Sequence, residues 1–494
     1  MFIGFHPTHC ALAVTSPSDV ADTSALVPSR PPRPPGVWSS IREALAGSRR
    51  DFTEGSIPRA IFLLAVPMVL EMALESVFAI VDVFFVARLG PNAVATVGLT
   101  EALLAVLYAV ALGLSVGATA TVARRIGEHD SEGAAHAAVQ CVALGLAAAI
   151  VLGTCGALFG PRLLALMGGG PAIVALGGSY ARVALGGCGT VLMLFVVNAI
   201  FRGAGDAAIA MRVLWLANGI NIVLDPCLIF GLGPFPHLGV TGAAVATTTG
   251  RAIGALFALY QLTRPGHRVV ITRRSLRVDL GQMWRLIRLS SSGAFQAFVG
   301  TASWIGLVRI ISTFGSTALA GYTIGLRIII FALLPSWGLS NAAATMVGQA
   351  LGAGRPERAA RAVWLTAFYD CCVLTLVGLL FVIAGRPIVS LFTADPAVRN
   401  IATRCLRIVA AGFPFYAYGM VITQAFNGAG DTWTPTWLNF GIFWVWEIPL
   451  AYVLATTGGL GPTGVFIAIA VAFSTLAVVS ALLFRRGRWQ GIAV

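Results

Sequence analysis

Residues 201–207 read Phe-Arg-Gly-Ala-Gly-Asp-Ala, and residues 426–432 read Phe-Asn-Gly-Ala-Gly-Asp-Thr. Asp431 stands 225 positions after Asp206, and the same offset aligns residues 113–115 (Gly-Leu-Ser) with residues 338–340 (Gly-Leu-Ser). An offset of 222 positions aligns residues 239–242 with residues 461–464. Self-similarity at a fixed separation indicates repeated structural units. The chain therefore consists of two related halves.

The composition places both halves in a membrane. Of the 494 residues, 57% are hydrophobic and 11% are charged, and the mean hydropathy is +0.85. No soluble domain of this length could expose such a chain to water. A membrane-spanning helix needs about 20 mostly apolar residues. Twelve such stretches can be placed, at residues 60–84, 93–120, 136–158, 175–201, 208–231, 241–262, 288–312, 319–346, 360–385, 397–424, 434–456 and 463–484.

The repeat sets the relation between the halves. Six helices separate the two copies of each repeated stretch, and an even number of crossings gives both halves the same orientation. Parallel repeats of this kind are related by an axis along the membrane normal, with the substrate site between them. We predict an all-α polytopic membrane protein with twelve transmembrane helices, in two six-helix bundles with pseudo-two-fold symmetry along the membrane normal.

The connecting segments predict the orientation and the domain limits. Cytoplasmic loops are enriched in Arg and Lys, and the even-numbered connections carry most of the Arg, so we expect both termini in the cytoplasm. The short amphipathic stretch 38–46 is expected to lie on the membrane surface. The predicted parts are a disordered cytoplasmic lead over 1–57, an N-lobe over 58–262, an Arg-rich cytoplasmic linker over 263–287, a C-lobe over 288–486 and a cytoplasmic tail over 487–494.

The chain has no lysine, because all 33 cationic residues are Arg. A nucleotide-binding P-loop and a pyridoxal Schiff base each need a Lys, so the polypeptide does not hydrolyse ATP by itself and carries neither chemistry. The eight Cys form no Cys-x-x-Cys pair and no metal-ligand spacing. We expect no enzyme, no cofactor and no nucleic-acid partner.

Carboxylates inside the spans are the strongest functional candidates, because a charge at mid-bilayer costs at least ~3 kcal/mol on insertion scales. Glu71, Glu75 and Asp82 lie within roughly 40° on one face of the first span, at about 100° per residue. Asn221 and Asp225 lie one turn apart on span 5. Hard oxygen ligands of this kind suit a proton or a small hard cation. The alternative is that these groups only hydrogen-bond one another to hold the N-lobe together.

Several motifs resemble the multidrug and toxic compound extrusion (MATE) family. They are residues 51–58 (Asp-Phe-Thr-Glu-Gly-Ser-Ile-Pro), Val81-Asp82 in span 1, residues 343–354 after span 8, and the two Gly-Ala-Gly-Asp turns. The resemblance extends from about residue 51 to residue 488. Each motif alone is weak, but their combination in this order is specific.

The resemblance implies a site and a hinge. In one prokaryotic branch of the family, the positions of Asp82, Asn221, Asp225 and Thr247 form a cation-coupling site in the N-lobe, and helix 1 bends at the position of Pro67. Under the 225-residue offset, the position of Asp82 is occupied by Leu307 in the second half. We therefore expect the C-lobe to lack this set of site residues.

Four further residues are assigned to the cavity. Glu71 and Glu75 depart from the family pattern, and either attract cations to a central cavity or pair with Arg. Tyr416 and Trp444 are the aromatic candidates for the cavity wall, where each cation–π contact would contribute about 0.5–2 kcal/mol.

These features predict a secondary active antiporter that exports organic cations, drugs or toxic metabolites in exchange for H⁺ or Na⁺ by alternating access. It would lie in the bacterial inner membrane as a monomer, because each chain contains both lobes, with organic cations and membrane lipid as partners. No metal is expected beyond Na⁺ at Asp82, Asn221 and Asp225.

Two alternatives remain open. A lipid-linked oligosaccharide flippase of the same superfamily would need a cationic cavity, which the acidic face of span 1 disfavours. A membrane-embedded enzyme or receptor is more distant, because no nucleophile motif and no large extramembrane domain is present.

Overall fold

The structure is a computed structural model that describes residues 36–48 and 50–492. Within this part of the chain, eleven helices are long and apolar enough to cross a membrane, and one bent helix pair makes a twelfth crossing. The chain is therefore a multi-pass, all-α membrane protein, as the hydropathy predicts.

The first bundle, the N-lobe, contains seven helices that make six crossings, because α5 and α6 together form one span. Their bounds are α2 Ile57–Ala87, α3 Pro91–Gly127, α4 Ser131–Leu166, α5 Pro171–Gly186, α6 Cys188–Ala204, α7 Ala207–Phe230 and α8 Val240–Thr263.

The second bundle, the C-lobe, repeats this order with more irregular helices. Its helices are α9 Leu280–Ser312, α10 Ser316–Gly352, α11 Pro356–Ser390, α12 Pro396–Ala410, α13 Phe413–Ala429, α14 Trp433–Asn439, α15 Ile448–Tyr452 and α16 Pro462–Arg485. Two π-helical stretches, Phe440–Glu447 and Val453–Thr457, flank α15 within the eleventh span.

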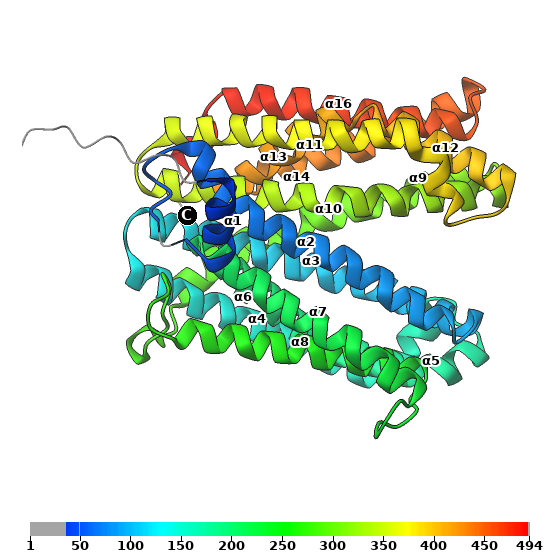
Figure 1. The fold of residues 1–494 in the computed structure, drawn as a ribbon, viewed down its shortest axis with the longest axis horizontal. Helices are drawn as coiled ribbons and strands as arrows, with labels where there is room; N and C mark the ends of the chain where they lie inside the picture. The colour runs from blue at the N-terminus through cyan, green and yellow to red at the C-terminus, as the bar shows by residue number, and fades with distance from the viewer. Residues whose placement is uncertain (1–35, 49, 493–494) are drawn as a thin grey trace, which may run out of the picture.

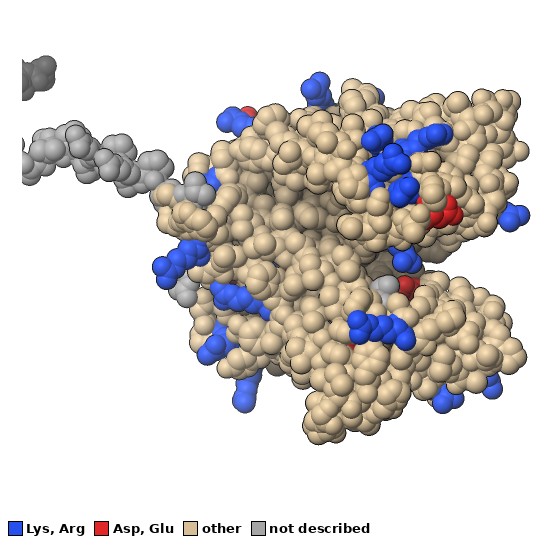
Figure 2. Space-filling model, turned by 45° about the vertical axis from the view of Figure 1, so that its right-hand side comes forward, with Lys and Arg blue, Asp and Glu red and all other residues tan. Residues whose placement is uncertain are grey.

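The two lobes lie one above the other in Figure 1, with their helices roughly parallel. Each lobe has its own hydrophobic core. The lobes meet chiefly through three helix pairs, α3 with α9, α2 with α10 and α3 with α10. We call the end where α1 and the C-terminal residues lie the terminal end, and the opposite end the open end, because Figure 2 shows the surface hollowed between the lobes there.

Backbone geometry confirms the duplication. Gly205 and Gly430 end α6 and α13 in the left-handed region, with φ/ψ of 87°/9° and 88°/1°. A side chain is disfavoured in this conformation, which explains why both turns keep Gly. Gly187 and Gly412 also correspond under the 225-residue offset, and each separates two helices of one span.

The bent span differs from the sequence prediction. Residues 397–424 were expected to form one helix, but α12 and α13 are bent by 60° at residues 411–412. Pro414 explains where the second helix begins, because proline has no N–H and is best tolerated in the first turn of a helix.

The predicted disordered lead also needs correction in its last part. Residues 1–35 lie outside the described residues, but residues 37–46, which include the predicted amphipathic stretch, form the helix α1 (Val37–Ala46). Arg212 of α7 donates hydrogen bonds of 2.7 Å to the carbonyls of Leu45 and Ala46 at the end of α1. The lead is therefore attached to the N-lobe before the first span begins.

Candidate functional site

Four polar side chains predicted from the sequence come together in the half of the N-lobe toward the open end; we call them the coupling layer. Asn221 of α7 donates a 2.9 Å hydrogen bond to the hydroxyl of Thr247 on α8. Asp225, one turn further along α7, is fully buried, and neither of its carboxylate oxygens has a partner among the described residues. Asp82 of α2 is half-buried and lies within electrostatic range of Asp225.

Small residues on α8 make this arrangement possible. A Cβ atom at Gly250 would lie 2.6 Å from the carbonyl oxygen of Ala217, and one at Gly254 would lie 2.8 Å from the Cβ of Ala217. Because α7 and α8 approach so closely, Thr247 is within hydrogen-bonding distance of Asn221. Pro226 has no N–H, so the carbonyl of Ile222 loses its helical partner beside the layer. The layer therefore brings together carboxylate, amide and hydroxyl groups, beside a turn of α7 that lacks one backbone hydrogen bond.

A second set of polar residues, the inner layer, lies toward the terminal end. Asn218 donates a 2.9 Å hydrogen bond to Glu75, and the Arg251 guanidinium lies 3.7 Å from the other oxygen of that carboxylate. Arg251 also donates to the hydroxyl of Tyr108 at 2.9 Å. Arg251 stands one turn after Thr247 on the same face of α8, which is the sequence signal that could have indicated its place beside the predicted site.

The other acidic residue of the first span is also neutralised. Glu71 is buried and forms an ion pair of 2.7 Å with Arg202 of α6. Of the two alternatives for Glu71 and Glu75, the structure shows Arg pairing for both. The face of α2 that is acidic in sequence therefore carries compensating guanidinium groups as far as Glu75, and only Asp82 lies beyond them.

We expect Arg202→Gln to lower the free energy of unfolding by about 3–5 kcal/mol, because it leaves the buried Glu71 carboxylate without its charge partner. Thermal unfolding of the purified protein in detergent measures this. The double variant Glu71→Gln/Arg202→Gln should regain part of the loss, since no lone charge remains. Arg361→Gln is the control, because its pairing with Glu357 is exposed. An Arg202→Gln variant that unfolds at the wild-type temperature would contradict the prediction.

The predicted cavity aromatics are in the C-lobe, but each has a partner there. Tyr416 stacks on Phe473 of α16 with ring centroids 3.9 Å apart. The indole N–H of Trp444 donates a 2.9 Å hydrogen bond to the carbonyl of Val299 on α9. Both rings therefore have structural contacts, and a substrate role for either stays a prediction.

The C-lobe has two buried carboxylates of its own, in a different arrangement. Asp370 of α11 accepts a hydrogen bond from Ser336 of α10, and Glu447 ends a π-helical stretch. Asp225 lies one turn from an Asn of its own helix that is hydrogen-bonded to a Thr of the next helix, and neither Asp370 nor Glu447 has such a pair beside it among the described residues. The coupling layer thus has no equivalent residue by residue in the C-lobe.

The lobes touch through backbone atoms at four symmetry-related glycines. A Cβ atom at Gly113 of α3 would lie 2.3 Å from the carbonyl oxygen of Ser290 on α9. Its repeat mate Gly338 of α10 would place a Cβ atom 2.7 Å from the carbonyl oxygen of Met68 on α2. Both contacts need a residue without a side chain, since real Cβ atoms do not approach backbone so closely.

The second pair of glycines lies closer to the terminal end. A Cβ atom at Gly127 would lie 2.0 Å from the carbonyl oxygen of Gln349, and one at Gly352 would lie 2.2 Å from the carbonyl oxygen of Arg124. The side chain of Gln349 donates a 2.9 Å hydrogen bond across the interface to the carbonyl of Gly203. The terminal end is therefore closed by direct backbone packing of one lobe on the other.

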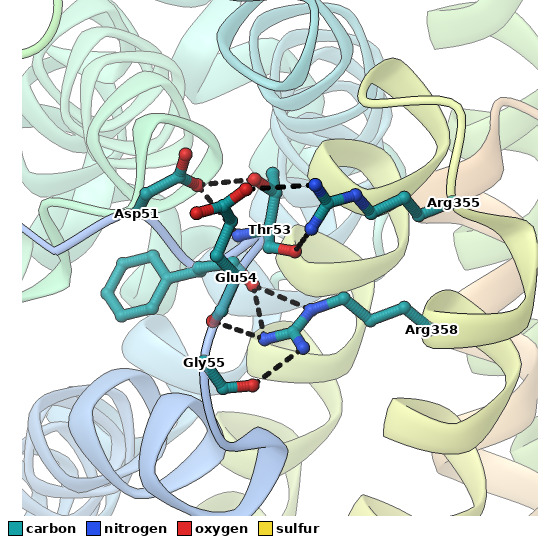
Figure 3. A network of polar contacts seen from close by, with 7 residues as sticks. Asp51, Thr53, Glu54, Gly55, Arg355 and Arg358 are labelled. Carbon is teal, nitrogen blue, oxygen red and sulfur yellow. Dashed lines mark hydrogen bonds and ion pairs between the residues drawn. The ribbon is translucent and has the colours of Figure 1, made fainter.

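A short segment before α2, residues 51–55, also bridges the lobes; we call it the first strap (Figure 3). Arg355 of the C-lobe donates to the carbonyl of Thr53 and pairs with Glu54, both at 2.9 Å. Arg358 donates to the carbonyls of residues 52, 54 and 55. The first strap thus ties the start of the N-lobe to α11 of the C-lobe.

The segment before α9, residues 275–279, forms a second strap in the same manner. Gln140 of α4 donates a 2.5 Å hydrogen bond to the carbonyl of Arg277 and accepts one of 3.3 Å from the N–H of Asp279. In each lobe, therefore, the segment that leads into the first crossing helix docks on the third crossing helix of the other lobe.

Asp51 gives the first strap a fixed turn. Burial raises the pKa of its carboxyl, but hydrogen bonds from the Thr53 hydroxyl (2.6 Å) and the Thr53 N–H (2.8 Å) outweigh burial, so this pKa lies below its usual value. The carboxylate stays charged at neutral pH and holds the turn that presents the carbonyls of the strap to Arg358.

Comparisons with known proteins agree with this architecture. The MatE family model matches residues 67–227 and 294–453, one segment in each lobe. The chain is similar to a probable multidrug resistance protein NorM of Thermotoga maritima, with 27% identity over 89% of this chain and 94% of that protein. It is also similar to an FAD transporter of Shewanella oneidensis, with 26% identity over 71% of this chain and 77% of that protein.

A solved structure described as the outward-facing conformation of a multidrug resistance MATE family transporter of the MOP superfamily has the same fold. The TM-score is 0.83 at 28% identity, and the match covers 88% of this chain and 97% of that chain.

Proposed function

The chain belongs to the MatE family, whose members are transporters and not enzymes, and we propose that it exports drugs or toxic organic cations in exchange for H⁺ or Na⁺ by alternating access. The termini lie in the cytoplasm of a bacterial cell in this proposal, so the open end faces outward. The structure then corresponds to the outward-facing stage of the cycle.

The observation that carries the proposal is the state of Asp225. Its carboxylate is fully buried beside Asn221, Thr247 and Asp82, and its two oxygens have no partner among the described residues. Burying a polar group without a hydrogen bond is costly, and burying a charge without compensation costs more. A proton or a small cation would relieve this cost, so the coupling layer has the chemistry of an ion site.

Helix α2 offers a route from this site to the lobe interface. Asp82 lies near one end of α2, and Met68, one residue after Pro67 in the other half of the helix, meets Gly338 of the C-lobe. Pro67 removes one backbone hydrogen bond from the middle of the helix. We propose that ion loading at Asp82 and Asp225 shifts α2 about Pro67, which loosens the contact at Gly338 and lets the terminal end open.

The purified chain in liposomes, with ethidium as the transported cation, tests the function. We expect an imposed H⁺ or Na⁺ gradient to drive ethidium against its concentration, and an ionophore for that ion to abolish the movement. Applying each gradient alone identifies the coupling ion. If neither gradient drives ethidium or any other organic cation tested, cation antiport is wrong.

Substrates that carry phosphate are a second candidate. Such substrates need a cationic cavity, and α2 no longer argues against one, because Glu71 and Glu75 pair with Arg202 and Arg251. One relative of the chain is an FAD transporter. The same liposomes loaded with FAD or with a lipid-linked oligosaccharide distinguish these cases. Gradient-driven movement of FAD, or flipping of the lipid, without movement of ethidium would favour an anionic substrate.

A further inference from the structure

The C-lobe has a groove on the side that faces away from the N-lobe. Its volume is about 740 Å³, and it lies between the α12–α13 break and α16. Figure 1 shows α16 at the edge of the molecule furthest from the N-lobe. Its lining residues all belong to α12, the α12–α13 break and α16, and Val478 among them is exposed, so the groove lies on the outer surface of the C-lobe and is separate from the hollow between the lobes.

The walls of the groove are apolar along most of its length. Ile408 and Gly412 line one side, and Val471 and Val478 line the other. Gly412 lets the break approach α16, because a Cβ atom there would lie 3.0 Å from the Cα of Ala470. An open apolar groove of this size on a lipid-facing surface fits a hydrocarbon chain.

Cationic side chains surround the end of the groove toward the open end. Arg407, which lines the groove, donates through Nε to the carbonyl of Val382 on α11 at 3.1 Å. Arg404 donates to the hydroxyl of Thr463 at the start of α16 at 3.3 Å. Arg386 stands one turn from Val382 on α11. None of the three arginines is in an ion pair among the described residues.

The depth of these residues fits a lipid of the leaflet at the open end. Val382 stands eight residues before the end of α11, which is roughly 12 Å along the axis at 1.5 Å per residue. Arg side chains at such depth extend toward the phosphate layer while their aliphatic stems remain in the hydrocarbon. A guanidinium binds phosphate oxygens with two parallel N–H donors.

The N-lobe shows that this cluster is not imposed by the fold. Under the 225-residue offset, Arg407 corresponds to Arg182, but Arg404 corresponds to Ser179 and Arg386 to Pro161. Figure 2 shows arginine side chains gathered on the C-lobe toward the open end. If the termini are cytoplasmic, these cations also run against the positive-inside trend, and an anionic group from outside the chain would complement them.

We propose that the groove is a binding site for an anionic phospholipid. One acyl chain lies along Ile408, Val471 and Val478, and the headgroup phosphate lies between Arg404 and Arg407. The lipid fills the space that the 60° bend opens between α12 and α16. This site is independent of the coupling layer and of the transported substrate.

Native mass spectrometry of the delipidated full chain, titrated with phosphatidylglycerol or phosphatidylcholine, tests the proposal. We expect phosphatidylglycerol to bind the wild type more tightly than phosphatidylcholine, and the double variant Arg404→Gln/Arg407→Gln to lose about tenfold or more in affinity for phosphatidylglycerol. Arg182→Gln, the same position in the other lobe, is the matched control and should bind as the wild type does.

A second variant tests whether the acyl chain of the lipid occupies the groove. Ala411→Phe places a ring in the groove and leaves every arginine in place, so it should weaken phosphatidylglycerol binding as well. Equal affinity for the two lipids, or no loss in the double variant and in Ala411→Phe, would overturn the proposal. Displacement of the lipid by millimolar inorganic phosphate would also overturn it, because the site would then recognise a free anion.

Discussion

The variant Asp82→Asn should lose gradient-driven efflux completely, down to the rate of protein-free liposomes. Asp82 and Asp225 lie within electrostatic range of each other across α2 and α7, and Asp225 has no partner for either oxygen among the described residues. An amide at position 82 cannot take up and release a proton, and it provides no charge for a cation. The cycle would then have no step at which ion movement changes the state of α2.

Two measurements separate this result from misfolding. The variant should reach the membrane in wild-type amounts and should still bind ethidium, measured by tryptophan fluorescence. Asp395→Asn is the control at the surface, since Asp395 only caps α12. If Asp82→Asn transports at the wild-type rate while Asp370→Asn does not, the ion site lies in the C-lobe and the proposed mechanism is wrong.

The variant Gly352→Ala should prevent the terminal end from closing. The new Cβ atom would lie 2.2 Å from the carbonyl oxygen of Arg124 and 3.0 Å from the amide nitrogen of Glu128. Both are backbone atoms of the opposite lobe, so no side chain can rotate to make room. The lobes must move apart at this end, and the arrangement with a closed terminal end becomes the minor state.

Spin labels at the repeat mates Glu132 and Glu357, both exposed at the terminal end, measure this separation. In a background without the native cysteines, the interlabel distance should lengthen in Gly352→Ala and remain unchanged in Gly98→Ala, where a Cβ atom would meet nothing within 4 Å. Efflux should fall together with the closed population. A distance distribution identical to that of the wild type would show that the interface tolerates the methyl group.

Much of the fold follows from local patterns in the sequence. Hydropathy predicts where the helices cross, and the 225-residue repeat predicts that the two bundles share one backbone plan. The α-helical period places Asn221 and Asp225 on one face of α7, while the family resemblance links them to Asp82 and Thr247. The hydrogen bond between Asn221 and Thr247 agrees with that assignment, although coupling itself stays a prediction.

What the sequence could not predict depends on contacts between distant helices. Arg202 and Arg251 stand 131 and 176 positions after their partners Glu71 and Glu75, with no repeat or period to connect them. The first strap is short and polar, so its composition indicated disorder, whereas its order comes from Arg358 of the other lobe. The bend before α13 had sequence signals in Gly412 and Pro414, and the three arginines of α12 already interrupt the apolar pattern before it.

The hollow at the open end has a pharmacological consequence. In the orientation proposed above, the arrangement in Figure 2 presents the space between the lobes to the side of the membrane away from the cytoplasm. A compound that wedges the lobes apart there would not have to enter the cell to act. Export from the cell could therefore not reduce the concentration of such a compound at its site of action, since that site lies on the outer side.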